Sequence, residues 1–152
     1  RPSGHFDGIA RAGVAMVTCM DSRIEPLKMI GLHLGDAKIL RNPGGRVTDA
    51  TLVALVLGVS LLNVDRILLV GHTRCAMASS SEDDMHDKLS EVSKTDTTWL
   101  SLGTISDQEQ TLRADVHRVT SHPLIPGHIK VGAFLYDVDT GLLNPVAKFA
   151  YS

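Results

Sequence analysis

The sequence Val14-Ala15-Met16-Val17-Thr18-Cys19-Met20-Asp21-Ser22-Arg23 joins an apolar run directly to a group of chemically active side chains. An apolar run of this length is typical of a strand that is covered on both faces, as strands of parallel sheets are. The residues that follow carry a thiol, a carboxylate and a guanidinium, on Cys19, Asp21 and Arg23. We therefore expect a first strand over residues 13–18 that ends at a functional group of residues.

Further strands are expected at three similar apolar runs and at one short segment after a tight turn, namely 37–41, 67–70, 129–138 and 142–146. Helices are expected between them, where apolar residues recur at helical spacing or follow a capping residue: 24–34, 48–62 and 106–121. This order predicts an α/β fold with a mainly parallel sheet of about four strands. The sheet should be flanked by helices, with a possible antiparallel edge strand.

The length of 152 residues and the hydrophobic content of 43% predict a single domain over residues 1–152. Residues 1–11 are mostly polar and contain two glycines, so we expect them to form a loose arm. Residues 76–102 are rich in Ser, Asp and Thr and have only a weak helical pattern at 85–92. This second segment is expected to be an excursion over the surface.

The charge and composition argue against several classes of partner. A formal net charge of −2 provides no attraction to nucleic acid or to an anionic membrane, and 4% aromatic residues argue against stacking on single strands. No apolar run approaches the ~20 residues that cross a bilayer. We therefore expect a small-molecule substrate, and neither nucleic acid nor membrane as partner. Two cysteines are too few for a disulfide framework, which favours the reducing cytoplasm.

Cys19, His72 and Cys75 each lie at or just beyond the end of an expected strand. If these strands are neighbours, their carboxyl ends share the edge of the sheet where ligands bind. Two thiolates and an imidazole favour zinc, and three protein ligands leave the fourth position open, as a catalytic zinc requires. On spacing alone, two buried unpaired cysteines are an equal alternative. Asp21 and Arg23 could likewise be a salt bridge or a helix cap.

Three segments together resemble the zinc signature of the β-class carbonic anhydrases: Cys19-x-Asp21-x-Arg23, Arg41-Asn42-Pro43-Gly44-Gly45 and His72-x-x-Cys75. The resemblance covers residues 12–146, and the chain is similar to the short prokaryotic members, which include carbonyl sulfide and carbon disulfide hydrolases. It implies one zinc ion per chain and reversible hydration of CO2 to bicarbonate by attack of zinc-bound hydroxide. Hydrolysis of carbonyl sulfide or carbon disulfide at the same site is the alternative.

Carried over residue by residue, the resemblance implies that Cys19, His72 and Cys75 bind zinc. Asp21 would either occupy the fourth zinc position or pair with Arg23 and leave that position to water. The expected lining of the substrate pocket is Gly44, Gly45 and Ala76.

The segment after the second cysteine departs from the family pattern, since Cys75-Ala76-Met77 stands where Cys-Gly-Gly is usual. This departure leaves the preference among CO2, carbonyl sulfide and carbon disulfide open. Two other hypotheses are a non-catalytic zinc-binding regulatory domain and a thiol redox protein in which Cys19 and Cys75 pair, although no Cys-x-x-Cys is present. The resemblance also implies a homodimer or a homotetramer.

Overall fold

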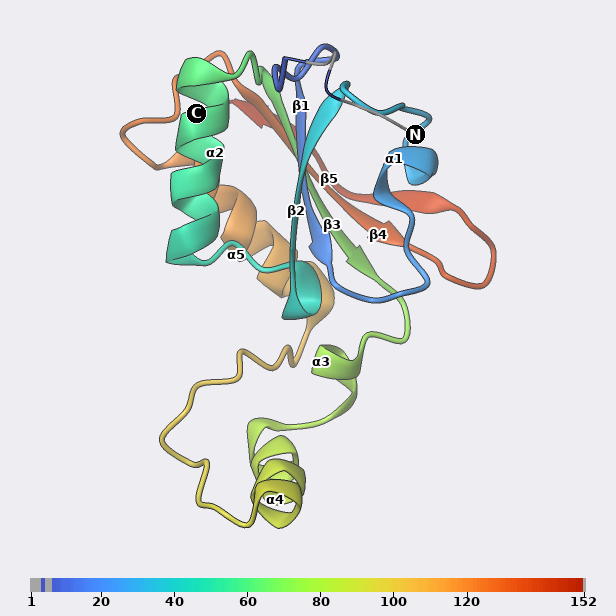
Figure 1. The fold of residues 1–152 in the computed structure, drawn as a ribbon, viewed down its shortest axis with the longest axis vertical. Helices are drawn as coiled ribbons and strands as arrows, with labels where there is room; N and C mark the ends of the chain where they lie inside the picture. The colour runs from blue at the N-terminus through green and yellow to red at the C-terminus, as the bar shows by residue number, and fades with distance from the viewer. Residues whose placement is uncertain (1–3, 5–6, 152) are drawn as a thin grey trace.

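The computed structural model describes the backbone of residues 4 and 7–151 and the side chains of residues 4 and 7–146. In these residues the sheet has five strands, in the spatial order β2-β1-β3-β4-β5 (Figure 1). Their bounds are Val14–Cys19 (β1), Ala37–Asn42 (β2), Arg66–His72 (β3), Lys130–Tyr136 (β4) and Leu143–Tyr151 (β5). Pairing is parallel from β2 to β4 and antiparallel between β4 and β5. The predicted α/β fold and its antiparallel edge strand are therefore confirmed.

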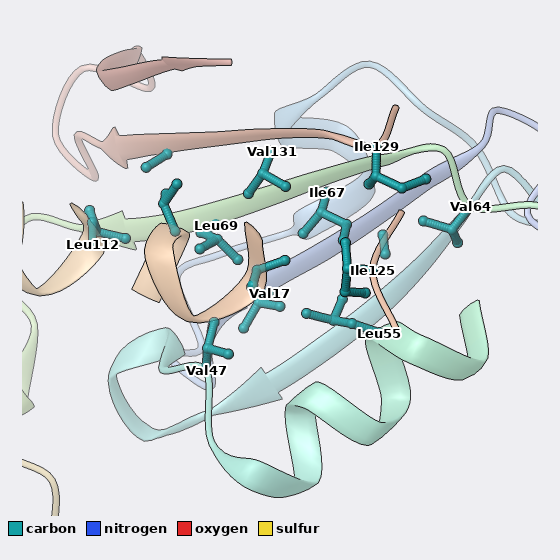
Figure 2. Packing of buried hydrophobic residues seen from close by; sticks show 14 of the residues in the cluster. Val17, Val47, Leu55, Val64, Ile67, Leu69, Leu112, Ile125, Ile129 and Val131 are labelled. Carbon is teal, nitrogen blue, oxygen red and sulfur yellow. The ribbon is translucent and has the colours of Figure 1, made fainter. Parts of the chain in front are cut away.

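The main core lies between the sheet and two long helices, α2 (Asp49–Leu61) and α5 (Gln108–Thr120). α2 packs against β1 and β2, whereas α5 packs against β3, β4 and β5. Figure 2 shows Leu55 of α2 in the same buried cluster as Val17 of β1 and Ile67 of β3. Burial of each such side chain contributes about 1.5–3 kcal/mol. This packing holds the two strands that carry Cys19 and His72 side by side.

The expected helix over 24–34 is wrong in length, because only α1 (Pro26–Met29) is helical. Gly31 adopts a φ of 71°, and its N–H donates to the carbonyl of Lys28, so the chain turns instead of continuing the helix. No helix in the described ranges combines the length and the apolar character needed to cross a membrane.

The expected surface excursion, 76–102, is more ordered than its sequence predicts. It contains α3 (Ala76–Ser79) and α4 (Glu82–Ser93). The Ser81 hydroxyl caps α4 by accepting a hydrogen bond from the Asp84 N–H at 3.1 Å. Acidic residues fill the first turn of α4, where the helix dipole favours negative charge. Figure 1 shows α4 projecting away from the sheet at the far end of this excursion.

The end of the expected loose arm, 1–11, is instead fixed to the body. Ala10 is buried and its N–H donates to the carbonyl of Leu62 at 3.1 Å. The Arg11 N–H donates to the carbonyl of Gly35 at 3.0 Å. Residues 1–3, 5 and 6 of this arm lie outside the described residues.

Candidate metal centre

Three of the expected site residues meet at the carboxyl edge of the sheet. Cys19 is the last residue of β1, His72 is the last residue of β3, and Cys75 directly precedes α3. Because β1 and β3 are adjacent and parallel, their ends lie at the same edge. The two sulfur atoms and one imidazole nitrogen lie within 4.8 Å of one another, and all three residues are buried.

The imidazole of His72 is oriented by the chain that follows it. Its Nδ1 lies 2.7 Å from the carbonyl oxygen of Thr73. A carbonyl can only accept, so Nδ1 carries a proton, and in the neutral ring Nε2 presents a lone pair. Among the described residues, Nε2 is the one buried side-chain N or O atom without a hydrogen-bond partner. A buried nitrogen of this kind is costly unless it binds a ligand, so it fits a metal ion.

Both cysteines are free and buried, and their surroundings distinguish them. The Gly44 N–H donates to Cys19 Sγ at 3.3 Å. Burial raises the pKa of the Cys75 thiol and the nearby Cys19 adds to this rise, whereas backbone N–H groups of Met77 and Ala78 oppose it. Two sulfurs and one nitrogen at a dry site are the donor set that zinc prefers. The residues present therefore fit a zinc ion.

Beside this cluster, Asp21 is paired with Arg23 through both carboxylate oxygens. Arg23 Nε donates to Oδ1 at 3.0 Å and Nη2 donates to Oδ2 at 2.7 Å, while the Arg23 backbone N–H also donates to Oδ1 at 2.8 Å. These hydrogen bonds hold the pKa of the Asp21 carboxyl far below its usual range, against the opposing effect of burial. Asp21 Oδ2 lies 3.8 Å from His72 Nε2. The Asp21 carboxylate thus lies next to the cluster and is bound by Arg23.

A family model described as carbonic anhydrase matches residues 14–143 of the chain. Beta-carbonic anhydrase 1 of Mycobacterium tuberculosis is 32% identical over 133 residues, which cover 88% of this chain and 81% of that protein. The chain belongs to the β-carbonic anhydrase family. It is therefore an enzyme of the carbonic anhydrase type, and the resemblance in the signature segments is confirmed.

Two further relatives add to this comparison. The crystal structure of a carbonic anhydrase from Streptococcus mutans superposes with a TM-score of 0.89 and 35% identity, covering 96% of this chain and 88% of that one. A carbon disulfide hydrolase from Acidithiobacillus thiooxidans is 27% identical over 148 residues, which cover 84% of this chain and 73% of that protein. The similarity therefore reaches both carbonic anhydrases and a hydrolase of a CO2 analogue.

In this β-carbonic anhydrase the turn Pro43–Gly45 closes against the end of β1. Gly45 has a φ of 64°, and a Cβ atom there would lie 2.9 Å from the carbonyl carbon of Thr18 and 3.0 Å from the Cys19 nitrogen. Only glycine allows this approach, and the approach places the Gly44 N–H on the Cys19 sulfur.

The expected pocket residues Gly44, Gly45 and Ala76 have different surroundings. Both glycines are buried, whereas Ala76 is exposed at the start of α3. A cavity of about 420 Å³ opens beside the Asp21–Arg23 pair, and its lining includes Arg23 and Tyr136 but none of these three residues. The assignment of the substrate pocket therefore stays a prediction.

Three residues that support the centre were not assigned a role from the sequence. Thr73 supplies the carbonyl that orients His72, and Gln108 Nε2 donates to the His72 carbonyl at 2.8 Å. Arg41 donates to backbone carbonyls of the segment that begins at Cys19. Arg41 is part of a signature segment, but Thr73 and Gln108 have no sequence feature that marks them.

Proposed function

We propose that this single domain, residues 1–152, is a zinc enzyme that catalyses the reversible hydration of CO2 to bicarbonate. The observation that carries the proposal is the unpartnered His72 Nε2, which lies among two cysteine sulfurs and 3.8 Å from a carboxylate. Cys19, His72 and Cys75 would hold the metal. A zinc ion in that position would supply a Lewis acid that makes water nucleophilic near neutral pH.

The chain's own residues would prepare the site for this reaction. The Thr73 carbonyl fixes the proton on His72 Nδ1, which keeps Nε2 free for the metal. Asp21 is held ionised by Arg23, and its Oδ2 faces the His72 side of the site. A carboxylate has more lone pairs than Arg23 occupies, so Oδ2 can accept a hydrogen bond from a reacting water and orient it.

The pairing of Asp21 with Arg23 also supports one of the two roles considered for Asp21. To occupy the fourth zinc position, the carboxylate would have to give up its hydrogen bonds with Arg23. Arg23 is itself held by donating through Nη2 to the carbonyl of Arg74 at 3.0 Å. We therefore propose that Asp21 leaves the fourth position to water in the arrangement described here.

Hydrolysis of carbon disulfide or carbonyl sulfide is the second candidate. It is favoured by the similarity to the carbon disulfide hydrolase of Acidithiobacillus thiooxidans and by Ala76-Met77 after the second cysteine. All three substrates are linear triatomic molecules, so the same metal centre could serve each. The wall beside Cys75 would then select among them.

Paired assays on the zinc-loaded protein test these alternatives. Metal analysis is expected to find one zinc per chain. Stopped-flow hydration of CO2 with a pH indicator is then compared with sulfide release from carbonyl sulfide and carbon disulfide. Faster sulfide release than CO2 hydration would reverse the proposed preference. Zinc without turnover of any of the three would leave a non-catalytic zinc-binding domain.

We also propose that the protein forms a homodimer or a homotetramer. Support comes from α2, on which Val53, Leu57 and Leu61 are 60%, 47% and 68% exposed. Leu124, which is 60% exposed, lines an apolar groove together with Val53 and Leu57. Contiguous exposed apolar side chains of this kind mark interaction surfaces. The two free cysteines support the proposed reducing location, the cytoplasm.

A further inference from the structure

The loop that leaves β1 is held from one side by a single arginine, Arg41. Arg41 lies in β2, opposite Thr18 of β1 in the parallel register. Its Nε donates to the carbonyl of Cys19 at 2.9 Å, and its Nη2 donates to the carbonyl of Asp21 at 2.7 Å. A longer contact of 3.5 Å joins Nη1 to the carbonyl of Ile24. One guanidinium thus reaches three backbone carbonyls of residues 19–24.

The acceptors of Arg41 are all neutral backbone carbonyls. In the described part of the chain, no carboxylate forms an ion pair with Arg41, whereas Arg23 and Arg46 each pair with an aspartate. The planar guanidinium presents its donors in a fixed fork. Its binding of three carbonyls therefore constrains both the position and the orientation of the loop backbone.

The constrained loop carries the groups that the proposed reaction uses. The Asp21 carbonyl accepts from Arg41 and also from the Ile24 N–H at 3.2 Å. The Asp21 carboxylate meanwhile accepts from the Arg23 side chain and N–H. The main chain of Asp21 is therefore fixed by β2, and its side chain is fixed by the loop itself.

We propose that Arg41 is a positioning residue, which rests on the proposed function. It holds the Cys19–Ile24 loop so that the Asp21 carboxylate stays beside the His72 Nε2 atom. In the described part of the chain, the side-chain hydrogen bonds of Arg41 go to backbone carbonyls and not to the cysteine sulfurs or the His72 ring. It acts through the backbone that carries Cys19 and Asp21.

A role in fold stability alone would have different consequences. Loss of an ordinary stabilising contact lowers the protection of backbone amides against hydrogen exchange throughout the sheet, and it leaves the local geometry of the folded enzyme intact. Loss of a positioning contact loosens residues 20–25 while β3 and β4 stay protected. The two possibilities are therefore separable by where the structure opens.

The test compares Arg41→Gln with Arg66→Gln in the zinc-loaded full chain. Arg66 is a matched control, because its Nη2 also donates to a backbone carbonyl, that of Ala12 at 2.8 Å, but at the opposite edge of the sheet. Hydrogen–deuterium exchange of residues 20–25 is expected to be about tenfold faster in Arg41→Gln, because charged donors to these carbonyls are lost. Arg66→Gln should leave that segment unchanged.

Kinetics on the same variants provide the second measurement. Arg41→Gln is expected to retain one zinc per chain, to lose about tenfold in kcat and to change KM little, since orientation rather than binding is affected. Arg41→Lys, which can still donate to a carbonyl, should recover part of this loss. If Arg41→Gln does not fold, hydrogen–deuterium exchange of residues 20–25 is measured on Arg41→Lys instead.

Exchange that rises equally in β3 and β4, or that stays at the wild-type rate in residues 20–25, would overturn the proposal. So would the absence of any recovery in Arg41→Lys. A wild-type protein without CO2 turnover would instead refute the proposed function, and the exchange result would still decide whether Arg41 holds the loop.

Discussion

The Asp21 carboxylate is firmly paired with Arg23, and it also lies next to the unpartnered Nε2 atom of His72. Replacement of Asp21 by alanine is expected to keep one zinc per chain, because Cys19, His72 and Cys75 remain. It should lower kcat for CO2 hydration by about a hundredfold, the lower end of the range for a residue that holds or moves a proton. Metal analysis and stopped-flow hydration measure the two effects.

A matched control for this substitution is Asp139→Ala. Asp139 also accepts from an arginine, Arg74, at 2.6 Å, but both side chains are mostly exposed. An exposed pair of this kind contributes little to stability, and neither zinc content nor kcat is expected to change. An Asp21→Ala variant that turns over CO2 at the wild-type rate would contradict the assigned role.

Metal removal should affect stability as well as turnover. Binding of a ligand to the folded state alone adds about 4 kcal/mol at a thousandfold excess over Kd. For a chain of this size that corresponds to a rise in Tm of roughly 10 °C when zinc is added to the metal-free protein. Cys75→Ser is expected to lose most of this rise, as measured by differential scanning calorimetry. Ala76→Ser, which keeps all three metal-binding side chains, should retain it.

The grouping of Cys19, His72 and Cys75 could be predicted in part, because each lies at or just beyond an apolar run and the ends of adjacent parallel strands meet, but their assignment as a metal cluster needed the family resemblance. The supporting contacts could not be predicted in the same way. The Thr73 carbonyl accepts from the His72 ring, and the Gln108 amide donates to the main-chain carbonyl of His72. A carbonyl has no residue-specific signal, and Gln108 comes from a helix whose register against β3 depends on packing.

One carboxylate joins the two ends of the excursion between α3 and α5 through three backbone hydrogen bonds. Glu82 Oε1 accepts from the N–H groups of Leu102, Gly103 and Thr104, at 3.0, 2.8 and 3.4 Å. Burial opposes ionisation of Glu82, but these N–H groups outweigh it and the His86 ring adds to their effect, so the pKa of Glu82 is lowered. α4 is thereby tied to the segment that returns to the body.

This lowered pKa determines how the tie depends on pH. Because the folded pKa lies below the unfolded one, the stabilisation is fully present above the ordinary glutamate pKa of about 4.3. It is lost as the pH falls through the lowered folded value. The protection of the amides of residues 102–104 against hydrogen exchange, measured relative to the intrinsic exchange rate at each pH, is therefore expected to fall only at acidic pH.

Glu82→Gln should show weak protection of residues 102–104 against exchange already at pH 7, with no further loss of protection on acidification from this group. Asp83→Asn is the control, since Asp83 lies in the same helical turn but is exposed. An unchanged exchange rate in Glu82→Gln would show that other contacts hold the segment.

The helices show where local sequence was a sufficient guide and where it was not. Residues 48–62 closely matched α2, because Thr48 caps the helix and the run that follows is mostly apolar. The helix expected over residues 24–34 did not match α1, because the positive φ of Gly31 prevents the helix from continuing. α4 was underestimated because its stability comes from its cap and its first-turn charges, while its apolar pattern is weak.

At the scale of the whole molecule, α2 carries an apolar face that stays exposed to solvent in the single chain. The double substitution Val53→Glu and Leu57→Glu is expected to convert the proposed oligomer to a monomer, because it would bury two charges in an apolar interface. Size-exclusion chromatography with light scattering measures the mass. Val92→Glu on α4 is the control, because Val92 is 84% exposed and lies on the projecting excursion.

An unchanged mass in the double variant would mean that α2 does not form the interface. A loss of mass in Val92→Glu would instead place an interface on α4. The mainly parallel sheet was predictable at this level, since helices alternate with strands along the chain, whereas the order of the strands was not. The assembly was not, because the exposed side of α2 is as apolar as its buried side.

The parallel pairing of β1 with β3 has a consequence for the timing of folding. The residues proposed to bind the metal lie on segments that are joined by β2 and α2, so no short piece of the chain contains the complete site. Contacts between distant segments form slowly because loop closure must come first. Zinc therefore cannot nucleate this fold as it does in a zinc finger. During refolding, we expect zinc uptake to lag behind helix formation, because the metal binds only after the sheet has assembled.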